Sequence, residues 1–352
     1  MKKIKITTFI FLLAIVFVPA FGQRKGNNGN KSENSSMFPS DRKEERQMKI
    51  DNSSASLPDQ KEEHRMKIDN SKSHVKVALN AYSFSKLLNA YVNGKEGESM
   101  TIFDLIDFCS ANNIPAVDLT GYFFVGYPEV PKDEYIYAIK KYAHMAGVSI
   151  SGTGVRNNFA NPNAAERAKD VQHVKDWIDV ASKLGAPVIR VFAGPVPEGY
   201  ENRWDEVAKW MIDCYKECAA YGAKRGVIVG VQNHGDMLKT ADQVISIVKA
   251  VKSPWFGSIV DTGYFISSDP YVDMEKVLPY AVNFQVKESA FGKESDSYID
   301  LPRLMKMINK SGYKGYLPIE TLSVAGRPYD PFTLVPSFLK KVNAAIEAEY
   351  NK

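Results

Sequence analysis

Four polar side chains stand at the ends of successive short apolar segments, and together they could hold a cation or move a proton. They are Gln232 in VIVGVQNHG, Asp261 in GSIVDTGYF, Gln285 in VNFQVKES and Glu320 in LPIETLS. Two carboxylates and two amide oxygens form a hard ligand set that suits Mg²⁺ or Mn²⁺ better than Zn²⁺. Each side chain alone could be a structural hydrogen-bonding residue or an ion-pair partner. Their recurrence on four successive segments favours a common site.

Two further titratable side chains lie two positions after members of this set. His234 follows Gln232 and Lys287 follows Gln285, so in extended strands each pair shares a face. Lys287 could stabilise an enolate, or act as an acid–base group if its pKa were lowered. His234 titrates near neutral pH and could carry a proton. A solvated lysine and a structural histidine are the alternatives. We therefore predict Glu320, Lys287 and His234 as the catalytic residues.

The segments that position these side chains alternate with amphipathic helices along most of the chain. Such alternation predicts parallel strand pairing, and eight strand–helix units in about 250 residues are typical of an α/β (β/α)8 TIM barrel. The expected strands are Val75–Ser83, Ile114–Leu119, Val148–Val155, Pro187–Phe192, Val227–Gln232, Gly257–Val260, Ala281–Val286 and Tyr316–Ile319. The expected helices are Ile102–Ala111, Asp133–Met145, Ala164–Leu184, Trp204–Ala223, Ala241–Val251, Val272–Val277, Leu301–Asn309 and Pro331–Glu347.

The connections between these elements also favour a barrel. A doubly wound open sheet needs a Gly-rich phosphate turn after its first strand, and Asn80–Phe84 (NAYSF) is no such turn. Several strand-to-helix connections are long, and a barrel builds its site from these loops. Polar groups mixed with aromatic rings suit a sugar. The substrate contacts expected there are Asn80, Tyr82, Arg156, Asn158 and Tyr264. Arg190 lies inside the fourth strand, where we expect it to balance a buried carboxylate.

The first 73 residues differ in composition from the rest. Residues 1–22 have a basic start, an apolar centre and the small-residue site Ala20-Phe21-Gly22, which are typical of a secretory signal peptide. Residues 23–73 contain the tandem repeat DRKEERQMKIDNS and DQKEEHRMKIDNS, and their polar composition predicts a disordered tether. We therefore predict a signal peptide (1–22), a tether (23–73) and a barrel (74–352) in an exported protein, either periplasmic or secreted.

Charge and cysteine usage exclude several classes of partner. The net charge is +4, and removal of the signal peptide leaves the chain near neutral, which gives no case for nucleic-acid binding. No apolar run is long enough for an integral membrane segment. The three cysteines are a poor disulfide framework, and we expect Cys214 and Cys218 to be buried packing residues. A homo-oligomer is left open.

In the segments VQNHGD, SPWFGSIVDTGYF, VNFQVKES and GYLPIETLS, the chain resembles the xylose isomerase-like barrel superfamily of sugar isomerases and epimerases. The resemblance covers about Val75–Glu349. It implies that Gln232, Asp261, Gln285 and Glu320 stand at the family's Glu, Asp, His and Glu metal ligands. The implied cofactor is a divalent ion, Mn²⁺, Mg²⁺ or Co²⁺, held more weakly because two ligands are replaced by glutamine.

The same resemblance implies a reaction and also limits it. Family epimerases use the glutamates of strands five and eight as paired acid–base groups, and Gln232 cannot take a proton. DNA-repair endonucleases of the superfamily need a His-rich zinc cluster, but only His234 among the five histidines ends a strand.

The expected function is that of an exported sugar isomerase or epimerase. Proton abstraction next to a carbonyl of a non-phosphorylated carbohydrate would start the reaction, with a metal ion or Lys287 holding the enolate. The alternatives are a keto-glycoside lyase that acts by β-elimination and a non-catalytic sugar-binding barrel.

Overall fold

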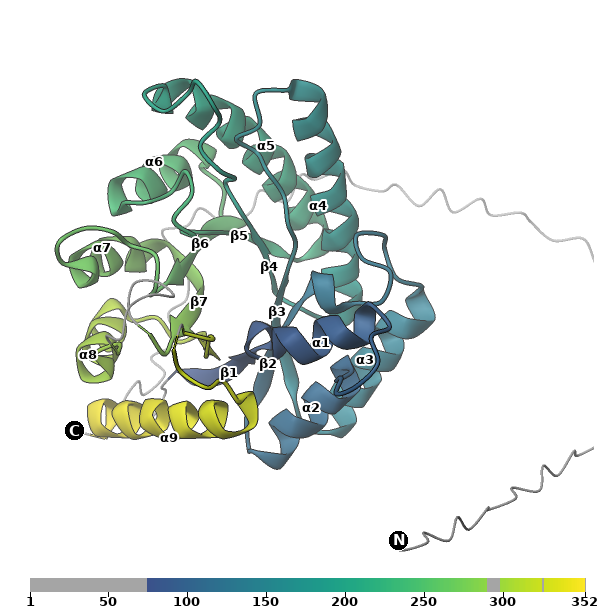
Figure 1. Cartoon of the computed structure of the whole chain (residues 1–352). Coiled ribbons are helices and arrows are strands. Elements are labelled where there is room, and N and C mark those ends of the chain that lie inside the picture. Colours follow the sequence, from purple (N-terminus) through teal and green to yellow (C-terminus); the bar gives the residue numbers. More distant parts are fainter. Residues whose placement is uncertain (1–74, 290–297, 325, 352) are drawn as a thin grey trace, which may run out of the picture. The chain divides into compact units, whose positions relative to one another are not determined.

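The computed structural model describes residues 75–289, 298–324 and 326–351, which form a TIM barrel (Figure 1). Its eight strands pair in chain order, and β8 closes the barrel against β1 through parallel pairing such as Val77 with Leu317. The predicted fold is confirmed for these residues. The strands are β1 (Lys76–Asn80), β2 (Ala116–Thr120), β3 (Ser149–Gly154), β4 (Val188–Val191), β5 (Ile228–Gln232), β6 (Phe256–Asp261), β7 (Ala281–Lys287) and β8 (Tyr316–Glu320).

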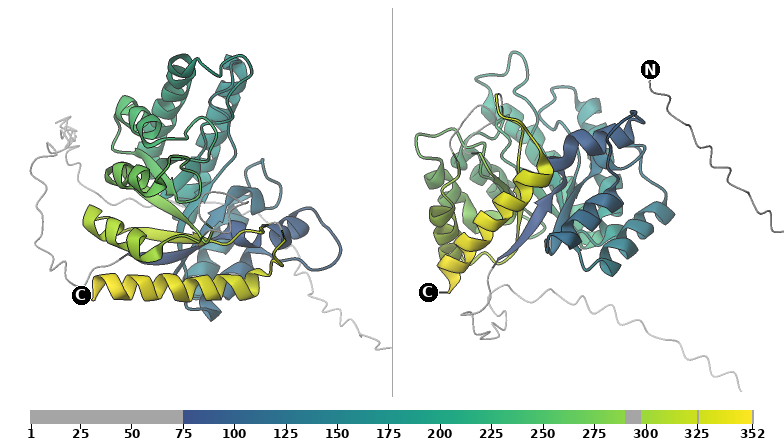
Figure 2. Two further views of the ribbon diagram at one scale, coloured as in Figure 1. Left: turned by 60° about the vertical axis from the view of Figure 1, so that its left-hand side comes forward. Right: turned by 60° about the horizontal axis from the view of Figure 1, so that its bottom comes forward.

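Helices surround the strands on the outside of the barrel, and α9 lies beside α8 (Figure 2). Within the described ranges, none of these helices is both long and apolar enough to cross a membrane. The predicted signal peptide (1–22) and tether (23–73) lie outside the described residues. The helices are α1 (Ser85–Val92), α2 (Ile102–Ala111), α3 (Asp133–Met145), α4 (Ala164–Leu184), α5 (Trp204–Arg225), α6 (Ala241–Val251), α7 (Pro270–Val277), α8 (Leu301–Ser311) and α9 (Pro331–Tyr350).

The largest departure from the predicted elements follows β1. This strand ends at Asn80, whose side chain accepts a hydrogen bond from the backbone N–H of Tyr82 at 2.8 Å. A short 3-10 helix (Ala81–Phe84) then leads directly into α1. The sequence analysis did not predict α1, which is only eight residues long and buries Leu88 alone. Tyr82 consequently follows the first strand instead of ending it.

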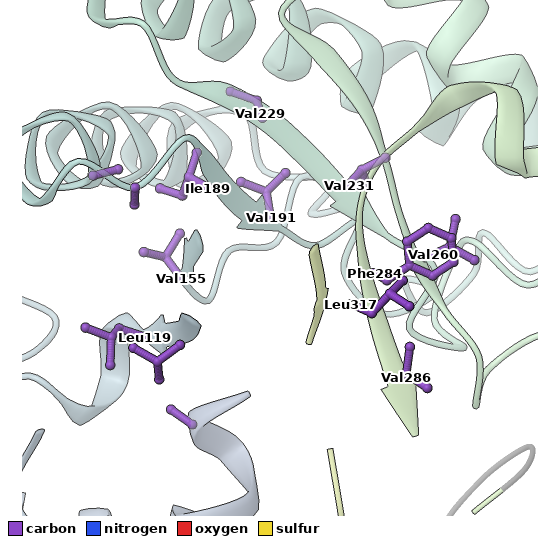
Figure 3. Packing of buried hydrophobic residues seen from close by; sticks show 14 of the residues in the cluster. Leu119, Val155, Ile189, Val191, Val229, Val231, Val260, Phe284, Val286 and Leu317 are labelled. Atoms are coloured by element: carbon purple, nitrogen blue, oxygen red, sulfur yellow. The ribbon is translucent and has the colours of Figure 1, made fainter. Parts of the chain in front are cut away.

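The main hydrophobic core lies between the strands and the surrounding helices. Strand residues that point outward, such as Val229, Val231 and Phe284, pack in this layer (Figure 3). The helices contribute large buried side chains, including Trp177 of α4 and Tyr215 of α5. Burial of each such apolar side chain contributes roughly 1.5–3 kcal/mol. Alternation along the strands then turns the remaining side chains toward the inside of the barrel.

The inside of the barrel is polar near its centre. Asp118 of β2 accepts a hydrogen bond from Asn283 of β7 at 3.4 Å, across the barrel. A Cβ on Gly152 would lie 2.5 Å from Asp118 Oδ2, so glycine leaves room for this carboxyl group. Burial raises the pKa of Asp118 to about 7, although the Arg190 charge lowers it. Arg190 thus partly balances a buried carboxylate, as the sequence predicted.

All three cysteines are buried and free, which confirms the interpretation of Cys214 and Cys218 as packing residues. Burial raises the pKa of Cys109 to about 12 and that of Cys214 to about 11. Neither thiol therefore has the lowered pKa that reactive cysteines require.

Candidate active site

A cavity of about 420 Å³ opens at the carboxyl ends of the strands. Its volume is in the range of roughly 300–1,000 Å³ that is usual for small-molecule sites. The residues that line it are Asn80, Tyr82, Thr120, Tyr122, Arg156, Asn157, Arg190, Phe192, Gly194, Pro195, Gln232, His234, Asp236, Tyr264, Gln285, Lys287, Glu320 and Leu322.

A buried lysine lies between two carboxylates at this end of the barrel. The register of β7 against β8 places Lys287 opposite Glu320. Lys287 Nζ is 2.6 Å from Glu320 Oε1 and 3.4 Å from Asp261 Oδ2. Lys287 is 4% exposed, Glu320 is 3% exposed and Asp261 is 0% exposed. The three charges therefore interact with little solvent screening. Lys287 and Glu320 line the cavity, whereas Asp261 lies behind them.

The two carboxylates keep Lys287 charged. Burial alone would lower the pKa of this ammonium group, but Asp261 and Glu320 outweigh burial and raise its pKa above the ordinary value. The lowered pKa that would make Lys287 a base is therefore absent. Burial raises the pKa of Asp261 to about 6, against the opposing effect of the Lys287 charge. Lys287 is thus a fixed cation that can donate hydrogen bonds into the cavity.

Both predicted glutamine ligands take part in hydrogen bonds with neighbouring side chains. Gln232 Nε2 donates to Asp261 Oδ2 at 2.5 Å. Gln285 Oε1 accepts a hydrogen bond from Asn80 Nδ2. Asp261 also accepts from the backbone N–H of Gly263 at 2.8 Å. These bonds join the end of β5 to that of β6 and the end of β1 to that of β7. Lys287 of β7 completes the polar network through its ion pairs with Asp261 and Glu320.

This network does not fit the divalent ion expected from the sequence. A cation shared by Asp261 and Glu320 would have to lie where the Lys287 ammonium group already bridges them. Two unit charges about 4 Å apart repel by about 4 kcal/mol at an effective dielectric constant of about 20, and a divalent ion doubles this.

His234 lies between two aromatic rings on another side of the cavity. Its ring centroid is 4.8 Å from that of Phe192 and 4.3 Å from that of Tyr264. Gly235 has a φ of +75°, and a Cβ there would lie 3.0 Å from Tyr264. Glycine therefore permits both the turn after β5 and the stacking of His234 on Tyr264.

Two arginines line a further part of the cavity together with Tyr122. Arg190 Nη2 donates to the Tyr122 hydroxyl at 2.5 Å. The Arg156 guanidinium lies over the same tyrosine ring, 4.6 Å from its centroid. Tyr122 therefore contacts both guanidinium groups, one through its hydroxyl and the other through its ring face.

Nearly all the side chains singled out in the sequence come together around this cavity. Asp261 lies behind it, as described, and Asn158 is not among its lining residues. The backbone N–H of Asn158 donates to Asp170 at 2.7 Å, and its side-chain oxygen is buried against Gly194. The neighbouring Asn157 lines the cavity instead and hydrogen-bonds both backbone groups of Phe192. The predicted roles of these residues stay predictions.

Several lining residues were not predicted as substrate contacts. They include Thr120, Tyr122, Arg190, Phe192 and Asp236. The clearest signal in the sequence was Arg190, because a charged residue in an otherwise apolar strand needs a polar neighbour. Asp236 could also have been found, since it follows VQNHG directly.

Comparisons with known proteins agree on the fold. The family described as xylose isomerase-like TIM barrel matches residues 107–336. A D-psicose 3-epimerase with D-tagatose from Clostridium cellulolyticum H10 superposes with a TM-score of 0.63 at 12% identity, over 77% of this chain and 99% of that one. A xylose isomerase domain protein from Planctomyces limnophilus gives 0.57 at 16%, over 80% and 100%. A search of curated sequences found no match.

Proposed function

The chain belongs to the xylose isomerase-like TIM barrel family, and we propose that it is a sugar isomerase or epimerase that removes a proton next to a carbonyl group. The observation that carries this proposal is the Lys287 ammonium group, which is bonded to Glu320 at the wall of a sugar-sized cavity. Epimerases among the structural neighbours support the same class of reaction.

Glu320 is the proposed base. Its Oε1 accepts a hydrogen bond from Lys287 at 2.6 Å, which orients the carboxyl group at the cavity wall. The carboxylate takes the proton from the carbon next to the carbonyl. The electron pair of the broken C–H bond forms a C=C bond to the carbonyl carbon. The π electron pair of the carbonyl group moves onto its oxygen, and the substrate becomes an enolate.

Lys287 is the proposed electrophile. Its ammonium group carries three N–H donors, of which Glu320 and Asp261 occupy two directions. The third is available to the developing enolate oxygen, where a buried and fixed charge is most effective. In this proposal Lys287 supplies the positive charge at the place where the sequence predicted a divalent ion.

The candidate reactions differ in whether the proton returns to the substrate. Gln232 occupies the place of the family's second acid–base residue and cannot carry a proton. His234 lines the cavity and is the proposed second carrier for isomerisation or epimerisation. Because Gln232 removes the symmetrical pair of carboxylates, β-elimination from a keto-glycoside is the second candidate. It shares the Glu320 and Lys287 step.

Solvent exchange tests the common step. The purified protein is incubated with a panel of ketoses, aldoses and keto-glycosides in D₂O, and NMR follows deuterium incorporation next to the carbonyl. We expect incorporation with the native protein and loss of it with Glu320→Gln. A matched control is Glu288→Gln, since Glu288 is also buried but points to Arg327, 3.1 Å away.

The products then distinguish the candidate functions. An epimer or an aldose–ketose pair identifies an isomerase or epimerase, and a released aglycone identifies the lyase. Sugar binding by calorimetry without exchange or product would contradict both enzymatic functions and favour the sugar-binding barrel. Unchanged exchange in Glu320→Gln would remove this residue from the mechanism.

Export of the protein is also proposed, and it rests on the composition of residues 1–22. Cell fractionation with the native chain and a variant that lacks this segment tests it. We expect only the native chain outside the cytoplasm, and equal distribution of both would contradict export.

A further inference from the structure

The cavity is lined by three permanently cationic side chains, and only one of them has a carboxylate partner. Lys287 is paired with Glu320 and Asp261. For Arg156 and Arg190, the described parts of the chain offer no carboxylate oxygen within 4.0 Å. For Arg190 this is unusual, because it is 5% exposed and buried charges are nearly always paired.

Arg190 is held in one orientation by neutral groups. It is 5% exposed. Its Nη1 donates to the backbone oxygen of Val155 at 3.2 Å, and its Nη2 donates to Tyr122. The guanidinium carbon also lies 4.0 Å from the ring centroid of Phe192. Five N–H groups belong to a guanidinium, so most of its hydrogen-bonding capacity is left for a ligand.

The backbone beside Arg190 leaves space for this side chain. A Cβ on Gly154 of β3 would lie 2.7 Å from Arg190 Nε. Only glycine therefore lets the guanidinium lie against the strand. The arginine is consequently preorganised, which lowers the entropy cost of binding an anion.

Arg156 adds a second positive charge at the rim. Its guanidinium lies over the Tyr122 ring at 4.6 Å, whereas Arg190 lies at 5.5 Å from the same ring centroid. Both arginines line the same cavity, that of the candidate active site. A ligand anion next to Tyr122 can therefore contact both guanidinium groups and the tyrosine hydroxyl.

The nearest carboxyl groups compensate these charges only in part. Asp118 attracts Arg190, but burial raises the pKa of Asp118 to about 7, and this residue does not line the cavity. Asp236 does line it, and burial raises its pKa to about 6. The Asp236 carboxylate accepts backbone N–H groups from Gly194 and Leu238 at 3.1 and 3.3 Å.

We propose that Arg190, Arg156 and Tyr122 form a subsite for the carboxylate of an acidic sugar, a uronate or an aldonate. The inference rests on the proposed function, because the sugar carbonyl would lie at Lys287 and Glu320 while its carboxylate lies at the arginines. The planar guanidinium fork matches a carboxylate in geometry. The cavity volume of about 420 Å³ accommodates such a sugar acid in full.

Calorimetry with matched sugars tests the subsite. The full chain is titrated with D-glucuronate, D-galacturonate and D-gluconate, and with D-glucose and D-galactose as neutral counterparts. Charge-assisted hydrogen bonds predict about 10- to 100-fold tighter binding of the acids. Added NaCl should weaken the binding of the acids more than that of the neutral sugars, because salt screens the attraction between the carboxylate and the exposed Arg156.

Variants then assign this preference to the arginines. Arg190→Gln should remove most of the preference for sugar acids. Arg156→Gln, at an exposed rim position, should reduce it without a risk to folding. Arg303→Gln is the control, since Arg303 is paired with Asp269 at 2.7 Å on the surface. This variant should keep the native preference for sugar acids.

Other outcomes are equally decisive. Equal affinity for acids and neutral sugars would overturn the subsite while the proposed function stands. Tighter binding of a hexose 6-phosphate than of every sugar acid would contradict the proposal that the subsite recognises a carboxylate. No binding of any sugar, together with no solvent exchange, would overturn the proposed function and this inference with it.

Discussion

Replacement of Lys287 by methionine should show how much this buried charge contributes to the free energy of unfolding. Methionine keeps most of the side-chain volume but removes the charge between Asp261 and Glu320, which are 0% and 3% exposed. Breaking a buried ion pair from one side typically costs about 3–5 kcal/mol. We expect Lys287→Met to lower the free energy of unfolding by this amount at pH 8, measured by equilibrium urea denaturation.

The loss should depend on pH with a defined sign. Burial raises the folded-state pKa of Asp261 to about 6 even with the Lys287 charge beside it, and without that charge the pKa rises further. Where folding raises the pKa of a carboxyl group, the free energy of unfolding falls as pH rises. The fall occurs between the pKa of the unfolded state, about 4, and the pKa of the folded state. The destabilisation should therefore be smaller at pH 5, where Asp261 can be protonated, than at pH 8.

A surface lysine provides the control. Lys310 forms an ion pair with Glu275 at 2.7 Å, but its side chain is 75% exposed. Lys310→Met should cost no more than about 1 kcal/mol at either pH. An equal loss for Lys287→Met at pH 5 and pH 8, or a loss no greater than that of Lys310→Met, would refute the argument that Lys287 compensates the two carboxylates.

Three further predictions concern the metal ligands, the barrel interior and the cysteines. Lys287→Met removes the competing ammonium group, and Gln232→Glu adds a third carboxylate. The double variant should therefore bind about one Mn²⁺ per chain, more tightly than the native protein, in calorimetry at pH 8. Unchanged affinity would mean that these groups do not face a common point. Gly152→Ala should lower the free energy of unfolding by about 1–3 kcal/mol, because its Cβ would lie 2.5 Å from Asp118 Oδ2, and an undiminished urea midpoint would contradict this. Since burial raises the pKa of Cys109 to about 12 and of Cys214 to about 11, a thiol reagent at pH 8 should label them only after denaturation, and rapid labelling of the folded protein would show that they are accessible.

Most of the fold could be predicted from the sequence because it depends on local periodicity. The apolar stripe of α4 contains Val171, Val174 and Trp177, and its period alone indicated a helix. Helix α1 was not predicted, and it is only eight residues long and buries Leu88 alone. The end of β1 was placed too late, since it is set by the hydrogen bond that the Asn80 side chain accepts from the backbone N–H of Tyr82.

The site could be predicted only to the level of which side chains gather there. Alternation placed Gln232 and His234 on one face, and the structure brings both to the cavity. It could not show that Lys287 reaches between Asp261 and Glu320, because this depends on the register of three strands. Nor could it indicate the Tyr122 contacts, which join residues 68 positions apart in the chain.

The ring of strands divides the cavity by position in the chain. Lys287, Glu320 and His234 come from the second half of the barrel, whereas Tyr122, Arg156 and Arg190 come from the first. Under the proposed mechanism, the first half can therefore accumulate substitutions that favour new substrates while the second keeps its chemistry. Directed evolution with this scaffold can accordingly confine its libraries to Arg190 of β4 and the loops after β2, β3 and β4. Recombination of half-barrels between relatives offers a second route to altered specificity.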